Sequence, residues 1–384
     1  MVFVDINTFY GPKAGGIRTY HRAKLDWFGR QTEHTYCLIH PGPTFRVERP
    51  APSVYLVQVF GWPVTKDPEG YRLLMDFPKV AAWLRRLQPD VIEAGDPWIT
   101  GPFALLLRAG GLWNGRLVSF FHSDPVSTYF QPWANRGAFQ FLRKPAAALA
   151  AQIFYLLQRR YDVTAVASRF LKSSLEAQGV TQVKYLPFGA HQEFFKARQD
   201  NRPLRRNGSA SATLRLLYAG RLDRDKGIET LLEILPALAN SQIEITVAGR
   251  GAFTEKFAAF RQPGFHFAGF VKDPKEMAEL YASHDVLLAP GPHETFGLGV
   301  LEAMAAGLIV VGPDAGGTGE LMAELKSPFQ FHAGDAQEFL AKIQSLNTTD
   351  LVLWSARHRE EAGRYGDWEQ VVARMVEAWN GLVA

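Results

Sequence analysis

The stretch from Pro290 to Gly307 places two carboxylates on either side of a glycine-bearing loop. It reads PGPHETFGLGVLEAMAAG, with Glu294 in its first half and Glu302 in its second. One carboxylate in a loop and one in a helix could hold hydroxyls on either side of a bound phosphate. A lone Glu at either position would be explained as a helix cap or a solvated side chain. Here an apolar run follows Glu302, so a buried carboxylate at this place needs a partner.

A strand, a loop and a helix must position these residues. The apolar run 285–289 has the length of a strand. The segment 298–306 has helix-forming composition, which Gly307 can end. Glycines in the loop allow the backbone to approach a ligand closely. The helix start directs free N–H groups near Phe296, Gly297 and Leu298 toward the loop, where they can bind a phosphate.

Two cations follow the strand predicted over 214–219. The sequence there is GRLDRDKG, with Arg221 and Lys226 five residues apart, before a helix expected from Ile228. Two cations at such a junction suit a diphosphate and can neutralise it as it leaves. The residue order of a Walker loop is missing. The turn at 249–251 lacks the third glycine of a dinucleotide fingerprint, so NAD binding is not expected.

Together these motifs resemble the signature of the retaining glycosyltransferases of family 4, which have the GT-B fold. The resemblance implies an α/β protein of two Rossmann-like domains that face a central cleft. It further implies that Glu294 contacts the donor sugar, that Glu302 contacts the ribose, and that N–H groups from Phe296 to Leu298 hold the diphosphate with Arg221 and Lys226. The nucleobase would lie near Val271. The sequence has one Asp-x-Asp, formed by Asp223 and Asp225 within the GRLDRDKG stretch. The resemblance nevertheless implies that the enzyme needs neither a metal nor a cofactor.

Strand-like runs alternate with helix-length segments through the first half, which is the pattern of parallel βαβ units. The sequence predicts a doubly wound sheet whose ligands gather at the carboxyl ends of its strands. Strands are predicted at 2–6, 35–39, 53–59, 90–94, 116–121, 163–167 and 184–186, and helices at 16–28, 71–86, 102–109 and 169–178.

Three places in the first half are candidates for ligand contacts. Gly15 and Gly16 open a helix and resemble the glycine pair that the family places over the donor phosphate and sugar. Arg18, one turn further, faces either the cleft or solvent. His122 follows a predicted strand, and the resemblance makes it a sugar contact near the reaction centre. Asp124 either orients this imidazole or acts in its own right.

The window from 125 to 161 contains no Asp or Glu. It carries Arg136, Arg143 and Lys144 among many aromatic residues, and the run 146–157 is apolar and helix-like. Basic, aromatic and helical character together is typical of an interfacial membrane element. An ordinary buried helix is the alternative. The first interpretation predicts a lipid or lipid-linked acceptor and peripheral association with an anionic membrane.

Length and composition are those of a globular protein with two domains. We expect an acceptor-binding domain over 1–195, a polar linker over 196–213 and a nucleotide-sugar-binding domain over 214–365. A helix over 366–384 often crosses back to the first domain in this fold. The single cysteine and the lack of a leader-like segment or a long apolar run favour the cytoplasm, and a net charge of +4 is too small to indicate nucleic-acid binding.

The sequence therefore predicts a metal-independent hexosyltransferase that moves a sugar from a UDP- or GDP-linked donor to an acceptor hydroxyl with retention. The alternatives are a non-catalytic nucleotide-sugar-binding protein and another GT-B enzyme, such as a sugar-nucleotide epimerase. The nucleobase, the sugar, the acceptor and the oligomeric state are not determined by these motifs.

Overall fold

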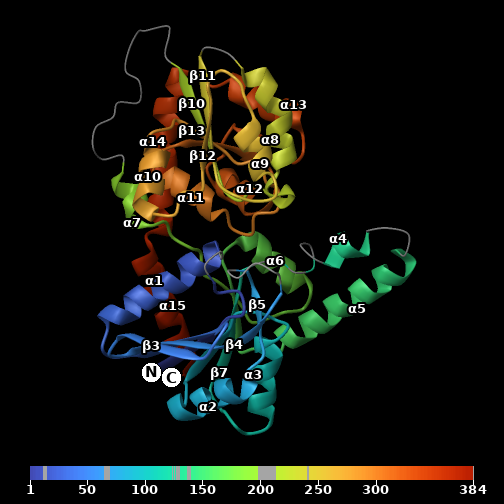
Figure 1. Cartoon of the computed structure of the whole chain (residues 1–384), viewed down its shortest axis with the longest axis vertical. Coiled ribbons are helices and arrows are strands. Elements are labelled where there is room, and N and C mark those ends of the chain that lie inside the picture. The colour runs from blue at the N-terminus through green and yellow to red at the C-terminus, as the bar shows by residue number, and fades with distance from the viewer. Residues whose placement is uncertain are drawn as a thin grey trace. The chain divides into compact units, whose positions relative to one another are not determined.

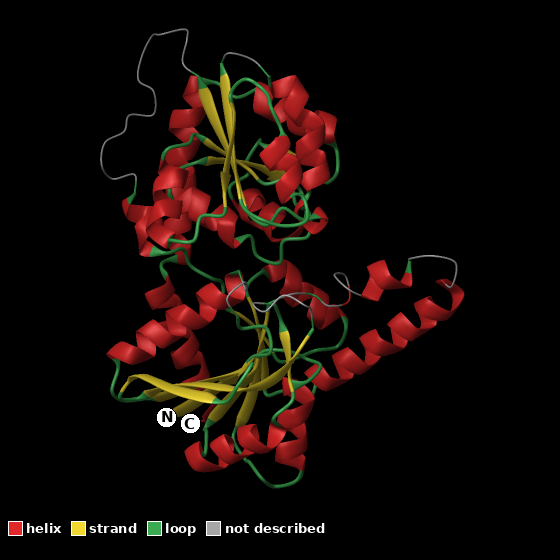
Figure 2. Ribbon diagram, viewed as in Figure 1, coloured by secondary structure: helices red, strands yellow, loops and turns green. Residues whose placement is uncertain are grey.

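A computed structural model of the chain describes residues 1–11, 15–64, 70–122, 124, 126, 130–135, 140–197, 213–239 and 242–383. The chain divides into two units (Figure 1). Met1–Leu186 and Val372–Ala384 form the first, and Pro187–Val371 form the second. Figure 2 shows the sheet of the second unit flanked by helices.

Within the described residues, the first unit is built on a nine-stranded sheet ordered β3-β4-β2-β1-β6-β7-β8-β9, with β5 paired to β4. Its strands are parallel except for β3 and β5, which run antiparallel to β4. The chain order reverses between β1 and β6, and this reversal is the switch point at which ligands bind in such sheets. The strands are β1 (Val2–Ile6), β2 (Thr35–Gly42), β3 (Arg46–Ala51), β4 (Val54–Pro63), β5 (Arg72–Leu74), β6 (Val91–Ala94), β7 (Arg116–Phe121), β8 (Val163–Val166) and β9 (Val183–Tyr185).

The central strands of this sheet are short apolar runs because both of their faces are covered. All four residues of β6 and of β8 are buried. Several helices begin at side chains that accept a backbone N–H, as Asp76 does at α2 and Ser168 at α6. The helices of this unit are α1 (Gly16–Arg30), α2 (Phe77–Leu87), α3 (Thr100–Ala109), α4 (Gln131–Ala134), α5 (Gln140–Gln158) and α6 (Arg169–Ala177), with α15 (Trp368–Val383) entering it at Val372.

The described residues of the second unit form a six-stranded sheet ordered β12-β11-β10-β13-β14-β15, in which every pair is parallel. Its switch point lies between β10 and β13. The strands are β10 (Leu214–Ala219), β11 (Ile243–Ala248), β12 (Phe265–Gly269), β13 (Val286–Leu288), β14 (Ile309–Pro313) and β15 (Gln330–Phe331). The helices are α7 (Gln192–Lys196), α8 (Ile228–Ile234), α9 (Thr254–Ala259), α10 (Pro274–Ala282), α11 (Leu298–Ala305), α12 (Gly316–Glu324), α13 (Ala336–Gln344) and α14 (Thr348–Tyr365).

The predicted helix over 71–86 is wrong in its first third. Residues 72–74 form β5, because they pair antiparallel with the end of β4. The helix starts only at Phe77, where the Asp76 side chain accepts from Lys79 N and a proline occupies the first turn. The sequence analysis also missed β3, whose polar, exposed residues lack a strand pattern.

The segment that follows Leu186 belongs to the second unit, whereas the sequence analysis placed residues up to 195 in the first. Apolar packing explains this boundary. Phe188 packs against Phe296, and Phe194 on α7 packs against Tyr281. Most of the predicted linker, residues 198–212, lies outside the described residues.

Candidate active site

The loops that follow β10 and β13 meet at the switch point of the second unit. A Cβ atom on Gly227, which has a φ of +68°, would lie 2.4 Å from the carbonyl oxygen of Pro290. A Cβ atom on Gly291 would lie 3.1 Å from Lys226 Cα. Glycine at both positions therefore lets the loops touch backbone to backbone. Across this contact, Lys226 Nζ lies 2.6 Å from Glu294 Oε1, and both side chains are half-buried.

The start of α11 presents unused backbone donors beside this ion pair. Gly297 precedes the helix with a φ of +89° and provides no side-chain cap. The first helical bond runs from Leu301 N to Gly297 O at 2.9 Å. The three N–H groups before Leu301 therefore have no acceptor within the helix, and they carry the positive end of its dipole. Such a helix start is suited to bind an anion.

A glycine turn supports the Glu294 loop from behind. Gly317 N donates to Glu294 O at 2.6 Å. A Cβ atom on Gly317 would lie 2.4 Å from Phe296 Cα, and one on Gly316 would lie 2.6 Å from Glu294 O. These glycines therefore shape the loop by packing against its backbone.

Glu302 is a part-buried carboxyl group on α11 that makes no hydrogen bond or ion pair with another described residue. Its burial raises its pKa to about 8. The buried phenol of Tyr281 is close to both site carboxylates. Burial raises the pKa of Tyr281 well above its usual value, and the charges of Glu302, Tyr218 and Glu294 raise it further. Glu302 and Glu294 thus share one neighbourhood, and Glu302 is protonated near neutral pH.

Arg221 lies in the same loop as Lys226 but has protein partners of its own. Its guanidinium pairs with Asp223 at 2.6 Å and also with Asp225. Its carbonyl oxygen accepts from Tyr218 Oη at 2.6 Å. A phosphate bound by Arg221 would therefore have to replace a carboxylate, whereas α11 offers donors that are free within the helix.

The carboxyl ends of β11 and β12 carry a cation–aromatic pair that the sequence analysis did not single out. The Arg250 guanidinium carbon lies 4.0 Å from the ring centroid of Phe270, which is 51% exposed. Val271, the expected neighbour of the nucleobase, follows directly in the chain. An exposed ring beside a guanidinium offers a flat surface for stacking. No sequence pattern marks this pair, because its members belong to two different strand ends.

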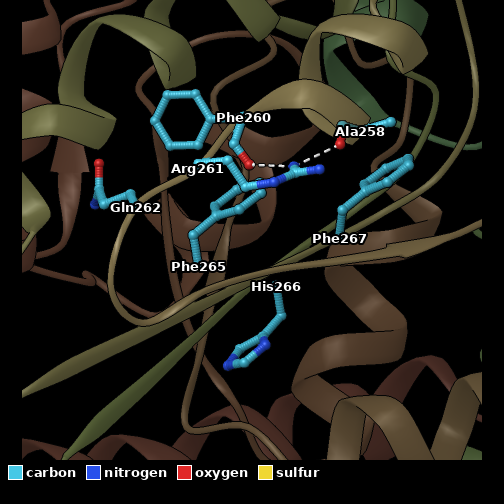
Figure 3. Close-up of a pocket in the computed structure, with 7 residues that line it drawn as sticks. All are labelled: Ala258, Phe260, Arg261, Gln262, Phe265, His266 and Phe267. Carbon is cyan, nitrogen blue, oxygen red and sulfur yellow. Dashed lines mark hydrogen bonds between the residues drawn. The ribbon is translucent and has the colours of Figure 1, made fainter.

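A separate pocket lies at the amino end of β12, where Figure 3 shows Phe265 and Phe267 on the opposite side of the strand from His266. Arg261 Nη1 donates there to the carbonyl oxygens of Phe260 and Ala258, at 2.8 and 2.6 Å. The site loops follow the carboxyl ends of the strands, whereas this pocket lies on the side of the sheet where the strands begin. It is lined by Ala258, Phe260, Arg261, Gln262, Phe265, His266 and Phe267.

In the first unit, His122 follows β7 and packs its ring between two aromatic side chains. The ring centroids of Tyr20 and Phe120 lie 4.8 and 5.0 Å away. Burial lowers the pKa of His122 to about 3, and the nearby charges of His21 and Lys24 add to this effect. The imidazole is therefore neutral at ordinary pH. Two residues further, Asp124 Oδ1 accepts from Val126 N at 3.0 Å.

A buried charge network anchors α1 to the sheet of the first unit. Lys24 Nζ on α1 lies 2.6 Å from Asp5 Oδ2 on β1 and 3.0 Å from Glu93 Oε2 on β6. The hydroxyl of Tyr20 donates to Glu93 at 2.7 Å, and that of Tyr36 donates to Asp5 at 2.6 Å. The network fixes the helix against the two strands of the switch point. Sequence reasoning missed it, because Lys24 and Glu93 are 69 residues apart.

The anchored helix begins at the glycine pair. Arg18 N and Thr19 N both donate to Gly15 O, at 3.0 and 3.2 Å. Gly15 is exposed, and a Cβ atom there would meet nothing within 4 Å. The N–H groups of Gly16 and Ile17 therefore have no acceptor within the helix. Arg18 is half-buried near this start.

Comparisons with known proteins identify the family of the chain. Residues 14–192 match the family described as Glycosyltransferase Family 4, and residues 213–348 match Glycosyl transferases group 1. A GDP-mannose-dependent alpha-(1-6)-phosphatidylinositol dimannoside mannosyltransferase of Mycobacterium tuberculosis is 30% identical over 317 residues, which cover 80% of this chain and 78% of that protein. The chain belongs to glycosyltransferase family 4.

Solved structures show the same fold as this family 4 protein. Sucrose-phosphate synthase from Thermosynechococcus elongatus is 20% identical and superposes with a TM-score of 0.77, over 100% of this chain and 99% of that chain. HepE from Anabaena, solved in complex with UDP-glucose, is 16% identical with a TM-score of 0.69, over 99% and 100% of the two chains. The expected GT-B fold is confirmed, and the protein is a glycosyltransferase that uses a nucleotide sugar.

The acid-free window of this glycosyltransferase forms the α4–α5 arm, comprising Gln131–Ala134 and Gln140–Gln158, which projects from the body of the first unit in Figure 1. One face of α5 is buried through Ala147, Phe154 and Gln158. The helix is therefore buried on one face, and its other face exposes apolar side chains. The exposed apolar side chains of the arm are Trp133, Phe141, Leu142, Leu149, Ile153 and Leu156.

Cations accompany this exposed face. Lys144 is exposed, and the guanidinium carbon of Arg143 lies 5.7 Å from the ring centroid of Trp133. Arg136, the third predicted cation, lies outside the described residues. None of the described helices is long and apolar enough to cross a bilayer.

Proposed function

We propose that this enzyme transfers a hexose from a nucleoside diphosphate to an acceptor hydroxyl with retention of the anomeric configuration. The observation that carries the proposal is the Lys226–Glu294 ion pair beside the open start of α11. Positive charge for a diphosphate and a carboxylate for a sugar lie side by side there. Nearby Glu302 adds a protonated carboxyl group that can bind a ribose hydroxyl.

In the proposed reaction, the bond between the anomeric carbon and the donor phosphate breaks, and the acceptor oxygen bonds to that carbon on the same face. The departing phosphate oxygen takes the acceptor proton. Lys226 and the α11 N–H groups stabilise the charge that develops on the diphosphate, and Glu294 stabilises the cationic sugar. The positive charge that stabilises the departing diphosphate comes from the protein itself. We therefore expect chelators of metal ions to leave the rate unchanged.

GDP-mannose is the first donor to test, because the relative with 30% identity is described as GDP-mannose-dependent. Thermal-shift titration with GDP-mannose and UDP-glucose will separate the two nucleobases, since a ligand that binds only the folded state raises the melting temperature. NMR of the product will then report the anomeric configuration. An inverted product, or no stabilisation by any nucleotide sugar, would remove the basis of this proposal.

For the first unit, we propose that the helix start at Gly15 and Gly16 contacts the donor phosphate and sugar, and that the neutral imidazole of His122 contacts a sugar hydroxyl. Arg18 is assigned to the acceptor, and Asp124 either orients the imidazole or acts in its own right near the reaction centre. The exposed glycine start of α1 and the neutral state of the His122 imidazole support the proposed donor contacts. Substituting Gly16 by Val should raise the KM for the donor without unfolding the protein, which circular dichroism will check.

We further propose that the acceptor is a lipid or a lipid-linked glycan at a membrane surface. The α4–α5 arm supports this, because it exposes apolar side chains beside cations. Flotation with vesicles of phosphatidylcholine and phosphatidylglycerol should recover the protein at low salt. Replacing Arg143 and Lys144 with Ser should lower this recovery, while replacing Lys326 and Lys342 of the second unit should not. Equal recovery of both variants would argue against the arm as a membrane contact.

A further inference from the structure

The β4–β5 ribbon, formed by residues 60–64 and 71–75, carries an exposed apolar face in the first unit. Register pairs Trp62 with Leu73. Backbone bonds join Val64 N to Tyr71 O at 3.0 Å and Met75 N to Phe60 O at 3.3 Å. Side chains on alternate residues share a face, so all six lie together. Their exposed fractions are 42% for Phe60, 62% for Trp62, 56% for Val64, 45% for Tyr71, 42% for Leu73 and 48% for Met75.

This face breaks the usual alternation of an antiparallel pair, in which one face is apolar and the other polar. The opposite face already supplies the core, since Leu74 is 1% exposed and belongs to the main hydrophobic cluster. The solvent face should then be polar, yet all six of its positions are apolar. Exposed apolar side chains gathered in this way mark an interaction surface.

The composition of the ribbon fits the boundary between lipid headgroups and acyl chains. Its described residues contain no carboxylate, and Arg72 donates to Gly61 O at 3.1 Å. Trp62 and Tyr71 are the amphipathic aromatic residues that concentrate at bilayer interfaces. A protein partner of matching polarity would have to supply a dry apolar face of its own, whereas a bilayer presents this environment without specific contacts.

Topology places the ribbon on the side of the sheet formed by the carboxyl ends of its parallel strands. The acceptor is proposed to bind on this side. The pairing of β4 with parallel β2 ends at Phe60 and Gly42, and the ribbon continues beyond it. Tyr71 contacts Phe9, in the loop after β1, with ring centroids 5.9 Å apart. The α4–α5 arm also leaves from this edge, because it follows the carboxyl end of β7.

We propose that the β4–β5 ribbon is a second membrane contact, whose six apolar side chains enter the headgroup–acyl boundary of a bilayer. This inference rests on the proposed membrane-surface function and deepens it. The arm contact depends on cations and weakens with salt. The ribbon contact is apolar and should persist at high salt and on neutral lipid. The ribbon and the arm together would hold this side of the first unit against the membrane.

The test uses the full chain, with vesicles of phosphatidylcholine alone and with vesicles that contain an equal share of phosphatidylglycerol, each at low and high salt. The ribbon variant is Trp62→Ser with Leu73→Ser, and the arm variant is Arg143→Ser with Lys144→Ser. Val352→Ser with Leu353→Ser, on α14, is the matched control, because these side chains are also apolar and about half exposed. Melting curves and donor hydrolysis, which the ribbon variant should leave unchanged, establish that each protein is folded.

We expect the ribbon variant to bind neutral vesicles roughly tenfold more weakly than the wild type, and the control to bind unchanged. Brominated acyl chains should quench the fluorescence of the wild type more than that of Trp62→Phe.

Wild-type binding that is confined to anionic vesicles at low salt would overturn the ribbon contact and leave the arm contact standing. Binding to neither vesicle would overturn both. A dimer that the ribbon variant alone disrupts, with vesicle binding intact, would assign this face to a second copy of the chain.

Discussion

The two units arrange their charged residues in opposite ways. In the first unit, Asp5, Lys24 and Glu93 are each at most 3% exposed and are paired with one another. In the second unit, Lys226 and Glu294 are half-buried, and Glu302 has no partner among the described residues. The first set is fully used in holding a helix on a sheet. The second set is left accessible, so it can interact with a ligand.

The difference shows that a cluster of charged residues is not by itself a binding site, because a fully paired interior charge can only position other groups. This comparison predicts that substitutions in the first set act mainly on stability. Substitutions of the ion-paired residues in the second set, Lys226 and Glu294, should act mainly on turnover.

The largest expected effect is that of Lys24→Met. The substitution leaves Asp5 and Glu93 buried without a counter-charge, which should lower the free energy of unfolding by about 3–5 kcal/mol. Denaturant titration followed by circular dichroism measures the change. A loss below about 1 kcal/mol would mean that the network is not a structural element, and the contrast between the units would disappear.

Lys226→Ala should lower turnover and leave stability nearly unchanged. Removing a cation that stabilises the departing diphosphate should lower kcat by roughly 10²–10³-fold. The free energy of unfolding should change by less than about 1 kcal/mol, because the half-buried Lys226–Glu294 pair contributes little to stability. Initial rates with a labelled donor measure the first quantity. Lys342→Ala, which removes a half-exposed cation far along the chain, is the control and should retain full activity.

Glu302→Gln sharpens the comparison through its pH dependence. The folded protein keeps the Glu302 proton up to about pH 8, while the unfolded chain releases it near 4.5. The carboxyl group therefore lowers stability progressively as the pH rises between these values. Glu302→Gln should be more stable than the wild type at pH 7.5, and this difference should shrink as the pH falls toward 4.5. Melting temperatures at both pH values test this, and a pH-independent difference would contradict the assigned cause.

The smallest expected effect is on the pH profile of His122→Asn. Burial lowers the pKa of His122 to about 3, so the imidazole stays neutral from pH 5 to 9. The substitution should lower kcat/KM without changing the shape of its pH profile over this range. A limb near pH 6 that the variant loses would show that this histidine does titrate during turnover.

Much of the fold and of the candidate site could be predicted from local sequence signals. Apolar runs alternating with helical segments indicated the sheet of the first unit, and the family resemblance implied that of the second. The α11 helix was predicted to within one residue because glycines stand at both of its ends. Residues 71–76 were wrongly assigned to a helix because the prediction used local composition alone. Residues 72–74 form a strand only because they pair with β4.

The sequence by itself determined the two doubly wound units and the loops that carry Lys226, Glu294 and Glu302, because strand length, glycine placement and helix composition are local properties. Only the tertiary structure decided that Lys226 and Glu294, 68 residues apart, form an ion pair. It also decided that Lys24 is interior and that Trp62 faces solvent. Burial and pairing depend on contacts between distant segments, and composition cannot distinguish an interior lysine from a surface one.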